Sequence, residues 1–285
     1  MNPILSDKIA LNIDDDAKVS VKGFIVPIEH TQSNYHMEFE WEELANFRVD
    51  VPEKVYSASV FRAFLPDAAV SVGNPWQIED AGALELLRQL HPNPRLDMRD
   101  YGDPGLWACL RAYTDEFADI VFRIHTEFKL GDGWFTPSQL TGHLIINRLT
   151  ETVSFFQMRL PDGPVNFEVG WEDERSWCDS NWIADTGFCA QMELRAGAED
   201  VLRDITTLYR YGSPTESFKG IYSPDEAPQR GAMSVEEAER VLNCQFYKSE
   251  QINWVSMEAA LELAQAQQKP IHAISIDGPL ADEAC

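Results

Sequence analysis

The spacing of apolar and polar residues changes along this chain, and each change marks a different predicted element. Between Asp80 and Leu90 the apolar residues recur at helical spacing, and the proline-rich run at 91–94 predicts the end of that helix. From residue 120 to residue 130 the period becomes two, which places apolar residues on one side and polar residues such as Arg123 and His125 on the other. This alternation predicts a half-buried antiparallel strand with one face in water.

Further strands are predicted in the middle of the chain. Residues 142–149 and 152–160 read as two strands, joined by a tight hairpin at Thr150 and Glu151. Two more strands are predicted at residues 165–171 and 189–196. The sequence therefore predicts an α+β fold whose main part is a β-rich meander or sandwich with flanking helices.

The C-terminal part of the chain alternates helices with short apolar segments. Residues 213–232 are rich in Pro, Gly and Ser, and they predict a linker that follows a β-rich domain at residues 1–212. Ser234 and Glu237 form a capping box at the start of one helix, and Ser256 caps a second helix at residues 257–268. Short strands are predicted at 251–255 and 269–278. This order predicts that residues 233–285 form the first half of a βαβ-type unit.

Composition and charge exclude several classes of function. The 285 residues are 44% hydrophobic, so the chain can build a core, but 23 basic and 47 acidic residues leave a net charge of −24. Such a surface repels nucleic acid and anionic membranes, which bind through Lys and Arg. The N-terminus shows no signal peptide, and no run of about 18 apolar residues predicts a membrane helix. We expect a soluble protein.

The five cysteines, at positions 109, 178, 189, 244 and 285, are too sparse for a disulfide scaffold and match no zinc motif. A reducing, cytoplasmic location fits this pattern. Cys178 and Cys189 are close enough in sequence to form a disulfide across a loop, and the alternative is that both are free buried thiols. Cys109 and Cys244 lie among apolar neighbours and are expected in the core.

Three segments in the middle of the chain carry a family resemblance. Residues 122–130 (FRIHTEFKL) and 134–143 (WFTPSQLTGH) are similar to the central domain of the selenoprotein N family, and residues 191–194 (QMEL) resemble another signature of that family. Towards the end of the chain, Trp254, the helix at 257–268 and the runs 269–272 (KPIH) and 278–285 (GPLADEAC) resemble its thioredoxin-like domain. The resemblance covers about the second half of the chain and leaves the role of the first hundred residues open.

The resemblance implies redox chemistry at Cys285. The family motif reads Gly-x-Leu-Asp-Asp-x-Ser-Cys-selenocysteine-Gly, so Cys285 falls on its cysteine and selenocysteine would come next. The implied activity is thiol–disulfide exchange with a disulfide-bearing protein or a peroxide-oxidised partner, without another cofactor. Since selenocysteine is encoded by a codon normally read as stop, we interpret the end at Cys285 as that codon.

Cys285 by itself is expected to be a weakly reactive thiol. Asp282, Glu283 and the terminal carboxylate lie beside it in the sequence, and negative neighbours disfavour the thiolate. The chain as it stands is therefore expected to be inactive. The family's calcium-binding loop does not carry over, because Asp14-Asp15-Asp16 lacks the ligand spacing of an EF-hand.

Other polar residues admit more than one interpretation. His30, His36, Glu38 and Glu40 are interpreted as surface residues of a strand rather than as a metal site. His125 and His143 either line a cleft between domains or hydrogen-bond a neighbouring strand, and we favour the hydrogen bond. The runner-up function is a non-catalytic, protein-binding β-rich module with an inert tail. A glycan-binding sandwich would need exposed aromatic side chains, for which the tryptophans at 134, 171, 177 and 182 are candidates.

Overall fold

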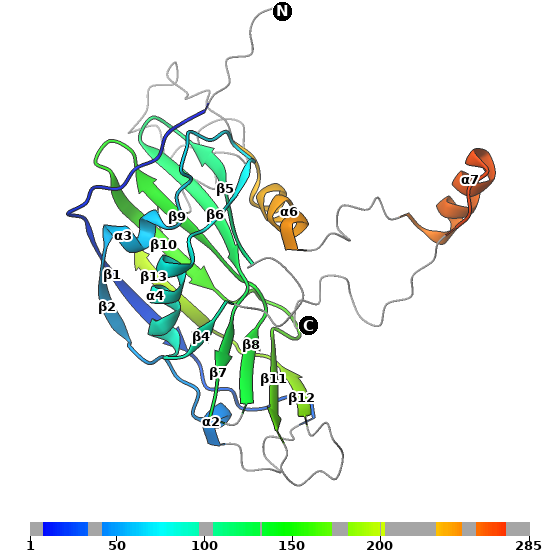
Figure 1. Cartoon of the computed structure of the whole chain (residues 1–285), viewed down its shortest axis with the longest axis horizontal. Helices are drawn as coiled ribbons and strands as arrows, with labels where there is room; N and C mark the ends of the chain where they lie inside the picture. Colours follow the sequence, from blue (N-terminus) through cyan, green and yellow to red (C-terminus); the bar gives the residue numbers. More distant parts are fainter. Residues whose placement is uncertain are drawn as a thin grey trace, which may run out of the picture.

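The computed structural model describes residues 8–33, 42–96, 105–131, 133–172, 182–199, 201–202, 232–246 and 255–271. These residues form two antiparallel β-sheets with a small number of helices, as Figure 1 shows. The β-rich α+β class predicted from the sequence is confirmed.

The larger sheet has eight strands in the order β2-β1-β13-β10-β9-β6-β5-β3. Every neighbouring pair in it is antiparallel. Its strands are β1 (Lys18–Ile25), β2 (Glu53–Ser57), β3 (Pro75–Gln77), β5 (Leu106–Tyr113), β6 (Phe117–Ile124), β9 (Leu140–Asn147), β10 (Thr152–Arg159) and β13 (Met192–Gly197).

The smaller sheet has five strands in the order β12-β11-β8-β7-β4. They are β4 (Pro94–Arg95), β7 (Glu127–Lys129), β8 (Gly133–Pro137), β11 (Phe167–Glu172) and β12 (Trp182–Gly187). The helices are α2 (Glu42–Ala45), α3 (Ala58–Arg62), α4 (Asp80–Leu90), α6 (Val235–Phe246) and α7 (Met257–Gln267). No helix in the described ranges is long and apolar enough to cross a membrane.

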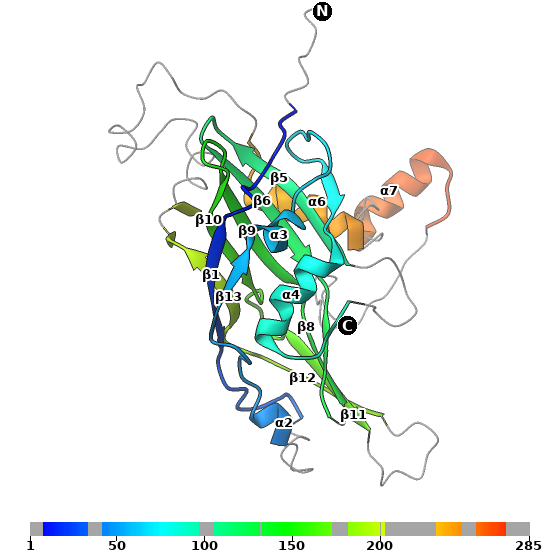
Figure 2. The ribbon, with the colours of Figure 1, turned by 60° about the vertical axis from the view of Figure 1, so that its left-hand side comes forward.

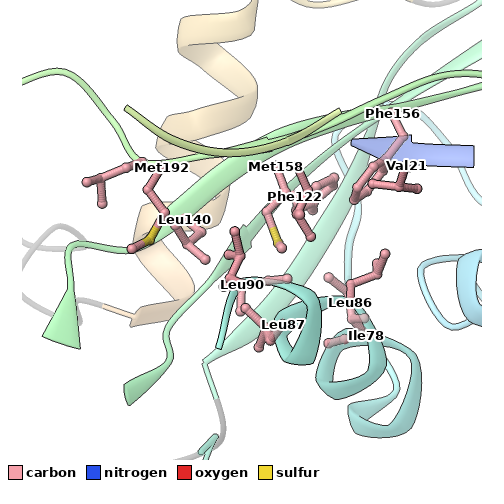
Figure 3. Close-up of a cluster of buried hydrophobic side chains, with 14 of the residues drawn as sticks. Val21, Ile78, Leu86, Leu87, Leu90, Phe122, Leu140, Phe156, Met158 and Met192 are labelled. Atoms are coloured by element: carbon pink, nitrogen blue, oxygen red, sulfur yellow. The ribbon is translucent and has the colours of Figure 1, made fainter. Parts of the chain in front are cut away.

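One hydrophobic core joins the two sheets and α4. Leu86 and Leu87 of α4 pack against the same buried cluster as Phe122 of β6 and Phe156 of β10, and Phe135 of the smaller sheet belongs to it too. Figure 3 shows α4 side chains pointing at this face of the large sheet, with α6 behind the strands. We call the face towards α4 the inner face and the opposite one, which carries α6, the outer face.

The sequence located the helix and the hairpin of this core well. The predicted helix is α4, which spans Asp80–Leu90 and ends at His91. β9 and β10 form the predicted hairpin, and Glu151 in its turn has a positive φ of 52°. The predicted strands at 165–171 and 189–196 correspond to β11 and β13, each shifted by one to three residues at its ends.

The single strand predicted at residues 120–130 was wrong in two respects. The chain leaves the large sheet after Ile124 and enters the small sheet at Glu127, so two strands, β6 and β7, replace one. The outer face of β6 is not in water either. Val121 is 2% exposed and Arg123 4%, because α6 packs on β5 and β6. A strand period of two identifies both faces, but it cannot show that a distant helix covers the polar one.

Three strands from the first hundred residues extend the large sheet on both sides. β1 pairs with β13 and β2 pairs with β1, so residues 18–57 extend the large sheet on one side. At the other edge, β3 pairs with β5. The sequence identified none of these strands.

Both predicted helix caps in the C-terminal part are present. The Ser234 N–H donates to the Glu237 side chain and the Glu237 N–H donates to Ser234 Oγ, both at 3.0 Å. Ser256 Oγ accepts from the Ala259 N–H at 3.2 Å. None of the residues of α7 is buried. The predicted linker, apart from Ala232, and the strand at 251–255, apart from Val255, lie outside the described residues. Of the last predicted strand only residues 269–271 are described, so the thioredoxin-like unit stays a prediction.

Candidate functional site

The three segments that carry the resemblance come together on the outer face of the large sheet. They supply residues of β6, β9 and β13, with β10 between the last two. Cross-strand pairing aligns Arg123 with Thr141, Thr141 with Arg159, and Arg159 with Glu193. Segments separated by about 70 residues in sequence therefore present polar side chains along one row of the sheet.

Next to this row, a buried ion cluster joins three strands. Asp119 of β6 accepts a short hydrogen bond from Nε of Arg111 of β5, and its other oxygen lies 2.9 Å from Nδ1 of His143 of β9. The Arg111 and Asp119 side chains are fully buried, whereas the His143 side chain is 14% exposed. The cluster thus extends from the interior to the surface and ends at His143.

The charge of Asp119 is held by its two basic neighbours. Burial by itself would raise the pKa of this carboxyl, but His143 and Arg111 outweigh burial and lower the pKa to about 2. A buried carboxylate that keeps its charge needs such partners, because its desolvation is otherwise costly. Asp119 is therefore ionised across the physiological range.

The same cluster connects the sheet to α6. Arg111 donates from Nη1 to the Met233 carbonyl at 3.2 Å, and the Met233 N–H donates to the Arg111 carbonyl at 2.9 Å. Further along, Arg123 donates to Gln139 at 2.5 Å and also to the Asn243 side chain of α6. The C-terminal part of the chain is consequently held to the sheet by two buried arginines.

Apolar contacts complete the interface with α6. Ala238 and Leu242 are fully buried against Cys109 and Val121 of the sheet. Burial, with the nearby Asp119 charge, raises the pKa of the Cys109 thiol to about 12, so this cysteine is an inert core residue as predicted. Cys244, also predicted to be in the core, is only partly buried.

His125 lies under the end of α6 and differs from His143. Its Nε2 is buried without a hydrogen-bond partner in the described structure. A side chain at Gly105 would collide with both His125 and Phe246, which shows how closely the chain packs there. Burial and the adjacent Arg123 lower the pKa of His125 to about 4, so the ring is neutral. The predicted hydrogen bond to a neighbouring strand is confirmed for the His143 side chain. Within the described part of the chain, the His125 side chain makes no such bond.

A second polar cluster surrounds Glu193 of β13. Gln157 and Gln191 each donate to its carboxylate at 3.3 Å, and Arg195 lies 3.5 Å from it. A shallow groove of about 330 Å³ continues from Arg195 across β1 and β2. The outer face therefore carries two polar clusters, and Ile145 and Phe155 form an apolar cluster on the same face.

A larger cleft lies elsewhere, at the end of α4. It has a volume of about 670 Å³, and its walls include Glu43, Asp50, His91 and Lys129. His91 stacks on Phe47 with a ring-centroid distance of 5.5 Å, and burial lowers its pKa although Asp50 and Glu43 oppose this. Apart from Lys129 and Leu130, none of the lining residues comes from the segments that carry the resemblance.

Several predicted site residues fall outside the described ranges. These include Cys285, Cys178, His36, Glu38 and Glu40. Cys189 is a free, buried thiol. Within the described part of the chain, no group of His, Cys, Asp or Glu is arranged to hold a metal ion.

Trp134, one of the tryptophans considered for glycan binding, packs on Gly170. Any larger residue at position 170 would collide with the Trp134 ring.

The sequence missed Asp119 and Arg111, which organise the candidate site. A weak signal was present, because Asp119 lies in the same strand phase as Val121 and Arg123. Nothing in the sequence paired it with Arg111 or His143, since that pairing depends on which strands become neighbours.

Comparison with known proteins finds selenoprotein N from three species. The chain is 29% identical over 269 residues to selenoprotein N of Mus musculus, covering 82% of this chain and 48% of that protein. It is 29% identical to selenoprotein N of Homo sapiens, with 82% of this chain and 45% of that protein covered. It is 30% identical over 274 residues to selenoprotein N of Danio rerio, with 84% of this chain and 48% of that protein covered.

The chain spans about half the length of the curated relatives it matches. No protein-family model matches the chain. No solved structure matches it either. The matches extend over more of the chain than the segments that first suggested the resemblance.

Proposed function

The chain belongs to a selenoprotein N-like family, and we propose that it is part of a thiol–disulfide oxidoreductase in which Cys285 is a redox cysteine. The observation that carries this proposal is that 82% to 84% of the chain aligns with proteins named selenoprotein N. The likeness of residues 278–285 to the family's Cys-selenocysteine motif supplies the position.

The proposed reaction transfers two electrons to a disulfide. A selenolate next to Cys285 attacks one sulfur of the substrate, forms a mixed selenosulfide and releases the first thiolate. The Cys285 thiolate then attacks the selenium of this intermediate, which forms the Cys285–selenium bond and releases the second thiolate. Two equivalents of an external thiol must reduce this bond before the next cycle, and they leave as a disulfide. In this scheme the selenolate is the attacking group and Cys285 the resolving one.

The contact between α6 and the sheet supports a fixed place for the start of the redox unit. α6 begins the proposed unit, and Arg111 and Arg123 bond it to the outer face. A substrate protein that contacts the outer face would then lie beside the redox unit. The proposed partner is a disulfide-bearing or peroxide-oxidised protein in a reducing cytoplasm, where buried thiols such as Cys109 and Cys189 stay reduced.

Disulfide reduction by the selenium-containing protein tests the proposal. With a protein disulfide as substrate, we expect Cys285→Ser to lower the turnover rate at least 100-fold, because the selenosulfide intermediate is no longer resolved. Cys244→Ser is the matched control and should retain activity, since Cys244 lies in α6. Full activity of Cys285→Ser would contradict the proposal.

The second candidate is a non-catalytic module that binds a protein through the 670 Å³ cleft at the end of α4. The cleft is distant in sequence from Cys285 and is lined by side chains of both charges. If Lys129→Glu abolished capture of a partner while Cys285→Ser had no effect on any activity, this second function would replace the first.

A further inference from the structure

His143 presents one ring nitrogen to the outside of the sheet. Its Nδ1 is bonded to Asp119 at 2.9 Å, and no partner of Nε2 is recorded in the described structure. Nε2 is not among the buried polar atoms that lack a partner, and the side chain is 14% exposed. A molecule approaching the outer face can therefore reach Nε2.

The buried Asp119 determines which nitrogen carries the proton. An ionised carboxylate only accepts hydrogen bonds, so Nδ1 must be the donor and Nε2 of the neutral ring carries a lone pair. Arg111 fixes Asp119, and the Met233 carbonyl fixes Arg111. The imidazole is consequently held in one tautomer and one orientation, as a proton acceptor requires.

Arg159 supplies a positive charge near His143, although Glu193 lies opposite Arg159 and accepts a hydrogen bond from Gln157. Gln157 lies directly opposite His143 on β10, and Arg159 is the diagonal neighbour on the same face, about 7–8 Å away by sheet geometry. The Arg159 side chain is 41% exposed and pairs with Asp162, which is itself 91% exposed. Such a surface pair contributes little energy, so the guanidinium can turn to a new negative group.

Thiols are the class of acid that this arrangement can deprotonate. An ordinary thiol has a pKa of about 8.5, within reach of imidazole, whereas a hydroxyl is far weaker and would need an additional electrophile. The side chains around His143 therefore fit a thiol.

We propose that the Asp119–His143 pair is a proton-transfer site for the thiol that exchanges with the redox pair. The thiol S–H proton moves to Nε2, and the imidazolium is stabilised by Asp119. The thiolate attacks a disulfide or selenosulfide, one S–S bond forms, and the bond it replaces breaks. A leaving alkyl thiolate takes the proton back from Nε2, whereas a leaving selenolate or aromatic thiolate stays ionised and Nε2 releases the proton to water, so protons and electrons balance. This role rests on the proposed redox function, and Asp119 acts in it as a positioning residue.

Exchange between 2-mercaptoethanol and a chromogenic aromatic disulfide, followed at neutral pH, separates the two proposals. We expect His143→Gln to lower the rate of the selenium-containing protein about 10- to 100-fold, because the attacking thiol is then deprotonated less readily. His30→Gln, which removes an exposed histidine, is the control and should have no effect. A wild-type rate for His143→Gln overturns the proton-transfer site and leaves the proposed redox function standing.

A measurement without turnover keeps the proposal testable if the chain shows no exchange activity. Nitrogen NMR of the wild-type imidazole should show the Nδ1-protonated tautomer of His143 and a saturable shift of Nε2 with 2-mercaptoethanol. Asp119→Asn should change the tautomer ratio and weaken the shift of Nε2 with 2-mercaptoethanol. An Nε2-protonated ring, or an Nε2 signal that ignores the thiol, overturns the proposal.

Discussion

The two faces of the large sheet are built from alternate residues of the same strands, yet they are stabilised by different physics. On the inner face, Phe122 stacks with Phe156 at 5.8 Å and meets Phe64 edge-on at 4.9 Å. On the outer face, β6 carries Asp119 and Arg123. Both side chains are buried, and α6 packs on this strand. Figure 2 shows α4 and α6 on opposite sides of the strands.

The difference teaches how each face can fail. Removing apolar atoms from a packed core costs stability that grows with the cavity left behind and falls as the neighbouring side chains relax into it. A buried ion pair contributes little net energy when complete, but removing one member leaves an uncompensated charge. The inner face should therefore respond to size and the outer face to pairing.

The largest effect is expected on the inner face. Phe122→Ala should lower the free energy of unfolding by about 4 kcal/mol, because it leaves a cavity among fully buried aromatic rings. The matched control, Val121→Ala on the opposite face, should cost about 2 kcal/mol, since fewer atoms are lost. Denaturant titration measures both. Equal losses would show that α6 covers its face as tightly as α4 covers the other.

Breaking the ion pair tests the outer face. Asp119→Asn should cost about 3 kcal/mol, because it leaves Arg111 buried without a counter-charge. The double variant Arg111→Met, Asp119→Leu should recover most of this loss, since no charge then remains buried at that pair. If the double variant is as unstable as the single one, packing rather than charge is responsible, and the contrast between the faces fails.

The pH dependence of stability sharpens the same contrast. The pKa of His125 is lowered to about 4 in the fold, against an ordinary value of about 6.5, so the unfolded chain binds the proton more readily between these values. Stability should therefore fall by about 3 kcal/mol as the pH drops from 7 to 4. His125→Phe should remove this part of the slope, and His30→Phe, at an exposed position, should not. An unchanged slope in His125→Phe would assign the dependence to other groups.

The smallest effect concerns the caps of the two C-terminal helices. Ser234→Ala should lower the global stability by about 1 kcal/mol, because α6 is part of the packed outer face. Ser256→Ala should leave it unchanged, because α7 buries no residue. Thermal unfolding compares the two. A loss in both variants would show that α7 also belongs to the cooperative unit.

The prediction of structure from sequence worked where the signal was local. The cap residues Ser234 and Ser256, the limits of α4 and the turn between β9 and β10 each depend on neighbouring residues. The water-exposed face assigned to residues 120–130 failed because α6, more than 100 residues later in the chain, covers it. The strands of the first hundred residues were also missed: β1 pairs with β13 far along the chain, whereas β2 pairs with the nearby β1 and β3 with β5.

The candidate site divides in the same way. Its residue types and the segments that carry them are visible in the sequence, and the residues of these segments are enough to indicate the selenoprotein N family. The sequence by itself thus determined the family, the α4, α6 and α7 helices and the inner-face pattern of β6.

Only the tertiary structure decided that Arg111, Asp119 and His143 form one cluster and that α6 closes over the sheet beside it. The physical reason is that these charges are buried beside partners that lie on other strands. Strand order and register, rather than any local preference, determine which side chains become neighbours.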